Sequence, residues 1–225
     1  MKKELLLASL AWGLLLPAPA ALYSSGNVNG SGTSLNLAIP DANPSGVTSA
    51  LLISGAGASL TDVNVTLNVS GGYNGDLYAY LSYNGTLVTL LNRVGTGSGD
   101  PIQSAFGYST AGFNNVTLDD AATGGSIHTV QNPGSLPTFS YTADGGSLAS
   151  FNGANPNGIW TLFFADLAGG NTSTLNGWSL DITAVPEPVN VALGVFGVVL
   201  GVWRVVRGRN QRGAGGHPQL KAGNV

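Results

Sequence analysis

Apolar and polar residues alternate in short runs through the middle of the chain, and this period of two is typical of half-buried β-strands. The clearest run is 61–69, where three valines and a leucine share one face. A second run, 77–83, alternates in the same way, and Asn84-Gly85 joins it to 86–91. Because both central residues of an Asn-Gly turn tolerate positive φ, this segment predicts a tight β-hairpin.

Further strands are predicted where short apolar or alternating runs are bounded by turn residues, at 47–54, 116–118, 138–141, 159–165 and 178–182. The run at 47–54 is apolar enough to be a buried strand, whereas the glycine-rich stretch 93–112 predicts loops. Eight or so short strands separated by turns predict an all-β fold, an antiparallel sandwich of two sheets over 47–184.

The first twenty residues have the features of a secretory signal peptide. Two lysines precede an apolar run at 5–16, and Ala18-Pro19-Ala20 supplies the small residues of a cleavage site. The run is too short to span a bilayer, so we expect cleavage after Ala20, with an uncleaved anchor as the alternative. Residues 21–46 are expected to hold a loose N-terminal lead, rich in Gly, Ser and Asn, and a first strand.

The pattern changes again near the C-terminus. Residues 189–203 are almost entirely apolar, and a helix of this length is roughly 22 Å long, short of the ~30 Å hydrocarbon core. Arg204 and Arg207 can snorkel, so the helix reaches a marginal transmembrane span. The arginines place its C-terminal end in the cytoplasm and the sandwich outside. A basic, glycine-rich tail occupies 213–225.

Composition and charge fit an exported β-protein. The chain has 34 glycines and few of the residues that favour helices. It has no cysteine, which excludes disulfides, thiolate metal sites and cysteine nucleophiles. Between Ala21 and Pro188 there are ten acidic residues and one basic residue, Arg93, for a net charge of about −9 at neutral pH. Such a charge excludes nucleic-acid binding through phosphates and attracts cations.

The exported part shows no catalytic motif. His128 is its only histidine, and no Gly-x-Ser-x-Gly elbow is present to complete a Ser-His-Asp triad. Zinc-protease, phosphate-loop and dinucleotide motifs are also missing. A pair of aspartates acting as in glycosidases stays open. We therefore predict no catalytic residues and no enzyme.

Two sets of side chains are candidates for binding. Four aspartates near predicted strand ends are candidate calcium ligands, because hard cations take oxygen ligands from such loops: Asp76, Asp119, Asp120 and Asp166. No EF-hand spacing is present, and the alternative is that they are solvated turn residues. Tyr78 and Tyr80 are candidate sugar-stacking residues, because alternation places them opposite Leu77 and Leu81.

At the C-terminus, Pro186, Glu187 and Pro188 precede the apolar run, and the arginines from Arg204 to Arg212 follow it. In this order the segment 185–212 resembles the PEP-CTERM sorting signal of Gram-negative bacteria that make exopolysaccharide. The resemblance implies recognition by an exosortase, a membrane enzyme similar to transpeptidases. The tail after the arginines departs from that family, whose signals usually stop there. A plain tail anchor is the alternative.

A second resemblance covers about 63–183. Its first block is Asn74-Gly75-Asp76-Leu77 followed by Asn84-Gly85-Thr86, and its second comprises 157–162, Asp166 and 175–180 with Trp160 and Trp178. These blocks resemble the P (Homo B) domain that accompanies subtilisin/kexin-like proprotein convertases. The resemblance implies a jelly-roll sandwich like that of galactose-binding domains. The protease of that family is a separate domain to which no part of this chain corresponds. The two tryptophans are expected in the core, with ligand stacking as the alternative.

These observations predict an exported, exosortase-sorted, non-catalytic protein of the cell surface or extracellular matrix, anchored by its C-terminal helix before processing. Its acidic sandwich is expected to bridge through calcium to exopolysaccharide. Two alternatives remain. One is a carbohydrate-binding module for exopolysaccharide, and the other is an accessory domain that works with a subtilisin/kexin-like serine protease encoded elsewhere.

Overall fold

The computed structural model describes residues 20–97, 106–107, 112–129, 140–187, 193–194 and 196–204. The chain divides into two units. Pro17–Pro186 form the first and hold all the described strands, and Glu187–Val225 belong to the second. We describe each unit by itself.

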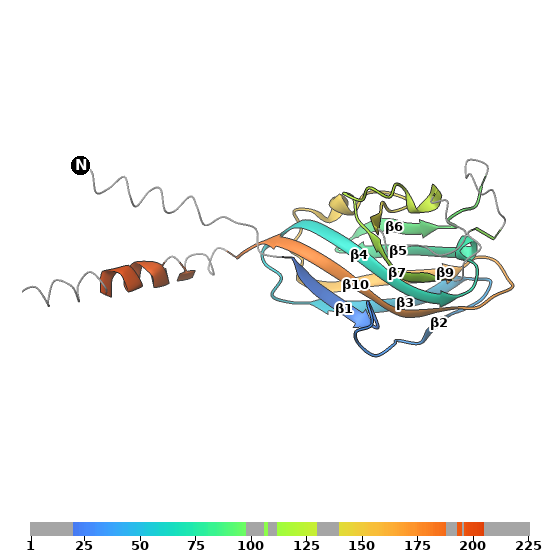
Figure 1. The fold of residues 1–225 in the computed structure, drawn as a ribbon, viewed down its shortest axis with the longest axis horizontal. Coiled ribbons are helices and arrows are strands. Elements are labelled where there is room, and N and C mark those ends of the chain that lie inside the picture. Colours follow the sequence, from blue (N-terminus) through green and yellow to red (C-terminus); the bar gives the residue numbers. More distant parts are fainter. Residues whose placement is uncertain are drawn as a thin grey trace, which may run out of the picture. The chain divides into compact units, whose positions relative to one another are not determined.

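The first unit is all-β, as the alternating pattern predicts (Figure 1). Its described strands are β1 (Ala21–Gly26), β2 (Leu37–Ile39), β3 (Asn43–Ile53), β4 (Ser59–Gly71), β5 (Leu77–Tyr83), β6 (Thr86–Asn92), β7 (Phe113–Leu118), β8 (Ser140–Tyr141), β9 (Gly158–Asp166) and β10 (Ser173–Val185). Three short 3-10 turns lie between them: η1 (Asn74–Asp76), η2 (Ile127–Thr129) and η3 (Leu148–Phe151).

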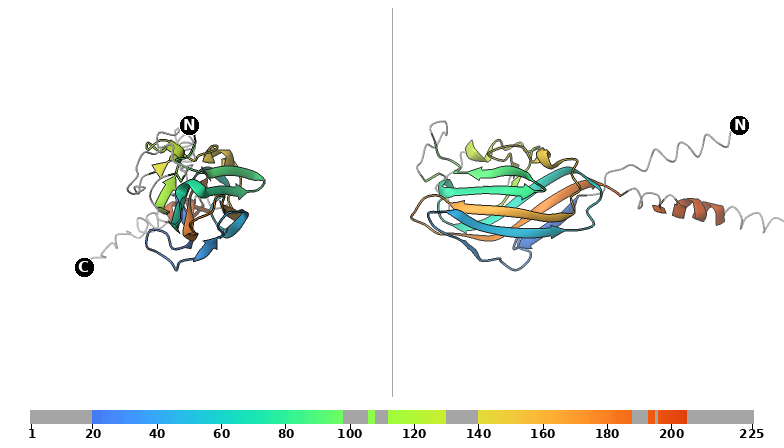
Figure 2. Two further views of the ribbon diagram at one scale, coloured as in Figure 1. Left: turned by 90° about the vertical axis from the view of Figure 1, so that its right-hand side faces the viewer. Right: turned by 180° about the vertical axis from the view of Figure 1, so that it is seen from behind.

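The strands form two sheets that pack face to face (Figure 2). The six-stranded sheet has the order β1-β10-β4-β7-β8, and β2 also pairs with β10. The four-stranded sheet has the order β3-β9-β5-β6. The pairs are antiparallel apart from β7 and β8, which run parallel. The sandwich is therefore confirmed, with a short parallel pair at one edge that the alternating pattern did not predict.

The core lies between the sheets, and on β4 and β5 it is built from every second residue. On β4, the apolar face from Val63 to Val69 is at most 3% exposed, as the period of two predicts. Trp160 and Trp178 are both 0% exposed, which confirms them as core residues. Their indole N–H groups donate to the Pro156 carbonyl and to Ser49 Oγ, at 2.9 Å each. Each large ring is thus buried with its polar atom satisfied.

The predicted hairpin between β5 and β6 is also present. Asn84 and Gly85 adopt φ of 48° and 81°, and Tyr83 pairs with Thr86 across the turn. Two positive φ values in succession are the requirement of a type I′ hairpin turn, which is why Asn-Gly occurs there.

Two other predictions were wrong. The loose lead expected after Ala20 begins instead as β1, which pairs with β10 from Ala21↔Ile182 to Gly26↔Gly177. The strand expected to be buried at 47–54 is β3, an edge strand whose outer residues Thr48, Ala50 and Leu52 are exposed. Backbone pairing with a distant strand overrides the weak local preference in the first case. In the second, no strand or helix among the described residues covers the outer face of β3.

In the second unit, residues 193–194 and 196–204 are helical. None of the helices among the described residues has both the length and the apolar character that a bilayer span requires. Most of the segment 189–203 predicted to cross the membrane is described, at 193–194 and 196–203, whereas the signal helix predicted at 1–20 lies outside the described ranges apart from Ala20.

Candidate functional site at the loop end of the sandwich

The two ends of the sandwich hold different segments of the chain. Both chain ends of the first unit lie at one of them, since Ala21 pairs with Ile182 and Val185 pairs with Ser59. At the other, Gly71 pairs with Ser173 and Asn43 pairs with Asp166. We call this second end the loop end. It includes η1, the start of the loop after β6 and the turn from β9 to β10.

Two of the four predicted calcium ligands, Asp76 and Asp166, meet at the loop end. Asp76 closes η1, where its N–H donates to the Tyr73 carbonyl at 3.2 Å. Its own carbonyl accepts from the N–H of Leu167 at 2.8 Å, and Leu77 pairs with Asp166 across β5 and β9. Asp76 is 2% exposed and Asp166 0%. The fold therefore buries two carboxyl groups side by side.

The charges of this pair are poorly compensated. Burial raises the pKa of Asp76, with a further contribution from the carboxylate of Asp166, while the positive charge of Arg93 lowers it. Burial also raises the pKa of Asp166, and the N–H groups of Ala168 and Ala42 oppose that shift. Oδ1 of Asp166 accepts from Ala168 at 3.2 Å, whereas its buried Oδ2 has no hydrogen-bond partner. Desolvation without matching donors is costly for the charged form.

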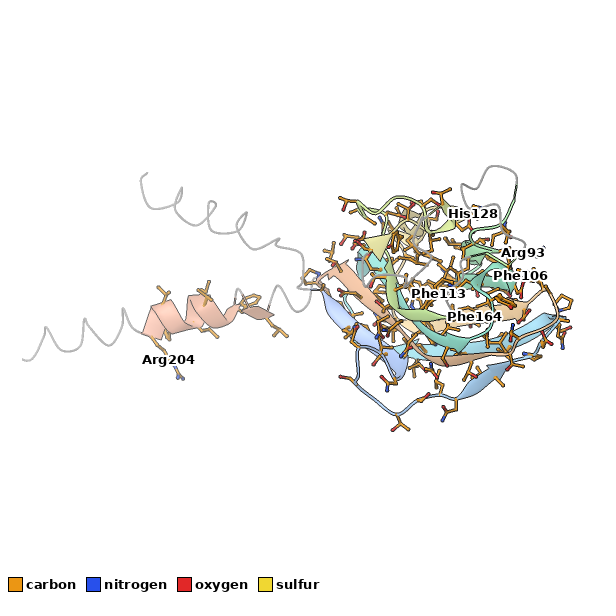
Figure 3. The ribbon with its side chains drawn as sticks, turned by 45° about the vertical axis from the view of Figure 1, so that its right-hand side comes forward. Arg93, Phe106, Phe113, His128, Phe164 and Arg204 are labelled. Atoms are coloured by element: carbon orange, nitrogen blue, oxygen red, sulfur yellow. The ribbon has the colours of Figure 1, made fainter. Side chains whose placement is uncertain are left out.

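Arg93 and Asp41 also act on this site, although the sequence pattern predicted neither as a site residue. Arg93 Nε donates to the Gly75 carbonyl at 3.0 Å rather than to an acid. Asp41 lies on the turn before β3, accepts from the N–H of Gly170 and raises the pKa of both Asp76 and Asp166. Figure 3 shows Arg93 with Phe106 and His128 at this end. The one available signal was that Arg93 is the sole base between Ala21 and Pro188.

The other two predicted ligands, Asp119 and Asp120, lie elsewhere, after β7. Asp119 accepts from the N–H of Ala121 at 2.7 Å. Asp120 accepts from Ser147 Oγ at 2.5 Å and from the N–H groups of Leu148 and Ala149 at 3.1 and 2.7 Å. Both carboxylates are thus used to shape a turn and to start η3. The predicted set of four is split between two places.

Among the described residues, no three His, Cys, Asp or Glu side chains gather closely enough to hold a metal ion. Around Asp119 and Asp120 the negative charges still interact. Burial raises the pKa of Asp62 on β4, and the carboxylates of Asp119, Asp120 and Asp181 raise it further. We call these four residues, Asp62, Asp119, Asp120 and Asp181, the second acidic group. Asp62 pairs with Thr183, at the end of β4 opposite the loop end.

Replacing Asp120 with alanine is expected to lower the free energy of unfolding by about 2 kcal/mol. The reason is that the start of η3 loses its charged acceptor for three donors. Urea unfolding followed by circular dichroism measures the loss. Asp120→Asn, which keeps one acceptor oxygen, should lose less, and equal losses in the two variants would contradict this assignment.

Without added metal, the sandwich is expected to become less stable as the pH rises from the ordinary aspartate pKa of 3.8 through the raised pKa values of Asp76 and Asp166. Asp76 and Asp166 have a pKa raised above the usual 3.8, so the protonated forms favour the folded state and this stability is lost as each group ionises. Urea unfolding in chelator at several pH values tests this. Asp166→Asn should flatten the profile, and an unchanged profile would contradict the prediction.

The two predicted sugar-stacking tyrosines lie on the outer face of the four-stranded sheet. Tyr78 and Tyr80 are half-buried beside Phe163. The rings of Tyr80 and Phe163 stack at 4.7 Å and 15°, and Tyr78 meets Tyr80 edge-on at 6.2 Å. We call these three side chains the aromatic row. One ring face of Tyr80 is used against Phe163, so the row offers ring edges and hydroxyl groups more than open faces.

His128 is held between two acceptors. Its Nδ1 lies 3.0 Å from Asp144 Oδ2 and its Nε2 lies 3.0 Å from the Thr96 carbonyl oxygen. In a Ser-His-Asp triad the second ring nitrogen faces a serine hydroxyl. Here a backbone carbonyl takes that place, so the imidazole joins η2 to the loop after β6.

The residues of the predicted processing signals are only partly described. Pro186 and Glu187 follow directly on β10, and Ala20 is the first residue described before β1. Arg204 is exposed in the helical segment. Ala18, Pro188 and Arg207 lie outside the described residues.

No protein-family model and no curated protein matches this chain. A chain from the complex of Aeromonas sobria serine protease with its chaperone ORF2 is similar at 21% identity and a TM-score of 0.43, over 79% of this chain and 29% of that one. The serine protease of Aeromonas sobria is similar at 18% identity and a TM-score of 0.42, over 75% and 27%. This chain thus spans less than a third of either one, and at these TM-scores neither likeness establishes a shared fold or function.

Proposed function

We propose that this chain is an exported, non-catalytic protein whose sandwich is an accessory domain for a subtilisin/kexin-type serine protease encoded elsewhere. The observation that carries the proposal is that the two sequence blocks resembling the P domain come together in space. Asp76 of the first block lies beside Asp166 of the second. Tyr83, next to the first block, stacks on Trp160 at 4.1 Å and 4°. A P-domain-like jelly roll would require such contacts.

The engagement of His128 supports the non-catalytic part of the proposal. Its ring nitrogens face Asp144 and the Thr96 carbonyl, so the ring is occupied as a structural link rather than as a base for a nucleophile. The buried aspartate pair does not fit glycosidase chemistry, because both groups are almost fully buried and a sugar must reach between the two carboxyls.

Capture of the partner tests this function directly. The tagged full-length chain is recovered from the cells that make it, and the eluate is labelled with a fluorophosphonate, which reacts with the active serine of serine proteases. We expect a labelled protease in the eluate and no label on the chain itself. Heat-denatured chain on the same resin is the control for binding to unfolded polypeptide. Absence of a labelled protease, or equal capture by the denatured chain, would refute the proposal.

We further propose that the chain is sorted to the cell surface or matrix of a Gram-negative bacterium by an exosortase, with the membrane helix as an intermediate anchor. The position of Pro186 and Glu187 supports this, because they follow β10 without a spacer and so begin where the folded unit ends. Cell fractionation with mass spectrometry of the mature ends tests both cleavages. A chain that keeps residues 1–20 in the cytosol would contradict this location.

Binding of exopolysaccharide is a second candidate function, favoured by the aromatic row. Tyr78 and Tyr80 lie half-buried on the outer face of the four-stranded sheet, where their ring edges could contact a sugar, and the Tyr78 hydroxyl is hydrogen-bonded to Thr89 Oγ1 at 3.4 Å. Retention on the polymer, with and without EDTA, is compared for the native chain and for Tyr80→Ala. Weaker retention of the variant would support the candidate, and equal retention would count against it.

A further inference from the structure

We propose that Asp76 and Asp166 hold one hard divalent cation of the calcium class at the loop end of the sandwich. The inference does not depend on the proposed protease partner, because it concerns the two buried carboxylates alone.

The first step is the position of the two groups. Neighbouring strands β5 and β9 bring them together, with Asp166 paired to Leu77, the residue after Asp76. The amide of Leu167 also donates to the carbonyl of Asp76. The backbone therefore holds both residues in place before any ligand arrives, as a preorganised cation site requires.

The second step is the oxygen atom without a partner. Oδ2 of Asp166 is buried and accepts no hydrogen bond, although the residue is 0% exposed. Buried carboxylate oxygens are normally matched by donors, because loss of hydration is otherwise not repaid. A bound cation satisfies such an oxygen as a hydrogen bond would.

The third step is that no positive side chain fills this role. Arg93 is near enough to favour ionisation of Asp76, but its Nε donates to the carbonyl of Gly75. Asp41, at the same end, adds a further negative charge. The local field is therefore attractive to a cation, and oxygen-only donors select calcium over softer metals. Two carboxylates leave the remaining coordination to backbone carbonyls and water.

The second acidic group provides the contrast. Asp119 and Asp120 already accept hydrogen bonds from Ala121 and from the start of η3, so these carboxylates are satisfied without metal. For this reason the proposal assigns the cation to Asp76 and Asp166 and not to all four aspartates.

The test is the melting temperature of the full chain at pH 7.5 in calcium chloride and in chelator. At a calcium concentration about a hundredfold above the dissociation constant, we expect a rise of about 5–10 °C. Asp166→Asn should abolish the rise, and in chelator it should itself melt at or above the native temperature, because the repulsion is gone. Asp62→Asn, from the second acidic group, should keep the full rise.

Terbium luminescence gives an independent readout of binding. If Asp166→Asn fails to fold, Asp76→Asn provides a second variant of the same site. Loss of terbium binding in either site variant, with retention in Asp62→Asn, supports the site. A native chain whose melting temperature calcium does not change overturns it, and so does a calcium response that survives Asp166→Asn. If calcium does not change the melting temperature but acidification raises it, Asp76 and Asp166 share a proton instead of binding a cation, and the proposal is overturned.

Discussion

Replacing Trp160 with alanine is expected to lower the free energy of unfolding by about 3–5 kcal/mol. The indole is 0% exposed, stacks on Tyr83 at 4.1 Å and meets the ring of Phe151 edge-on at 5.1 Å. The change would leave a cavity between the sheets and remove the donor to the Pro156 carbonyl. Since domains of this size are stable by about 5–15 kcal/mol, a large part of the total is lost.

Urea unfolding followed by far-ultraviolet circular dichroism measures this loss. Ile159→Ala is the matched control, because its side chain lies next along the same strand and is 63% exposed. It should cost less than about 1 kcal/mol. Trp160→Phe should lose less than the alanine variant, because it keeps an apolar ring against Tyr83. A loss below about 1 kcal/mol for Trp160→Ala would contradict the assignment of this ring to the core.

The second large effect is expected from Gly75→Ala at the loop end, with a loss of about 1–3 kcal/mol in the free energy of unfolding. A Cβ at Gly75 would lie 2.4 Å from the amide nitrogen of Gly107 and 2.5 Å from the carbonyl carbon of Phe106. Both are backbone atoms and cannot rotate away. The segment at 106–107 must therefore move, and the hydrogen bond from the Gly75 N–H to the Phe106 carbonyl is lost with it.

Hydrogen exchange of the Gly75 amide, with thermal unfolding, measures this effect. Gly169→Ala is the matched control at the same end, because its Cβ would meet only the Cβ of Ala42 at an ordinary 3.7 Å. That variant should be within about 0.5 kcal/mol of the native chain. If Gly75→Ala exchanged and melted like Gly169→Ala, the close packing of η1 against 106–107 would be refuted.

The same contact explains why glycine precedes Asp76. Residues 106–107 pack directly on the backbone of η1, so position 75 has no room for a Cβ. This close approach lies next to Asp76, whose burial raises its pKa. The calcium proposal and the Gly75 prediction therefore concern one structural unit, yet their readouts differ.

The local structure of the sandwich follows directly from the amino-acid sequence. The faces of β4 and β5, the hairpin at Asn84-Gly85 and the core positions of Trp160 and Trp178 all follow from side-chain period and turn chemistry, which act over a few residues. The acidic charge of residues 21–188 is likewise a property of composition alone.

Only the tertiary structure decided which distant residues meet. Asp76 and Asp166 are far apart in the sequence, and their pairing depends on β5 and β9 being neighbours. Asp119 and Asp120 have the same residue type and a similar place in the sequence pattern, but their carboxylates accept hydrogen bonds that stabilise a turn and the start of η3. Residues 21–26 form the strand β1 because they pair with β10. The physical reason is that strand pairing and burial of charge are long-range effects, which no local pattern of residues records.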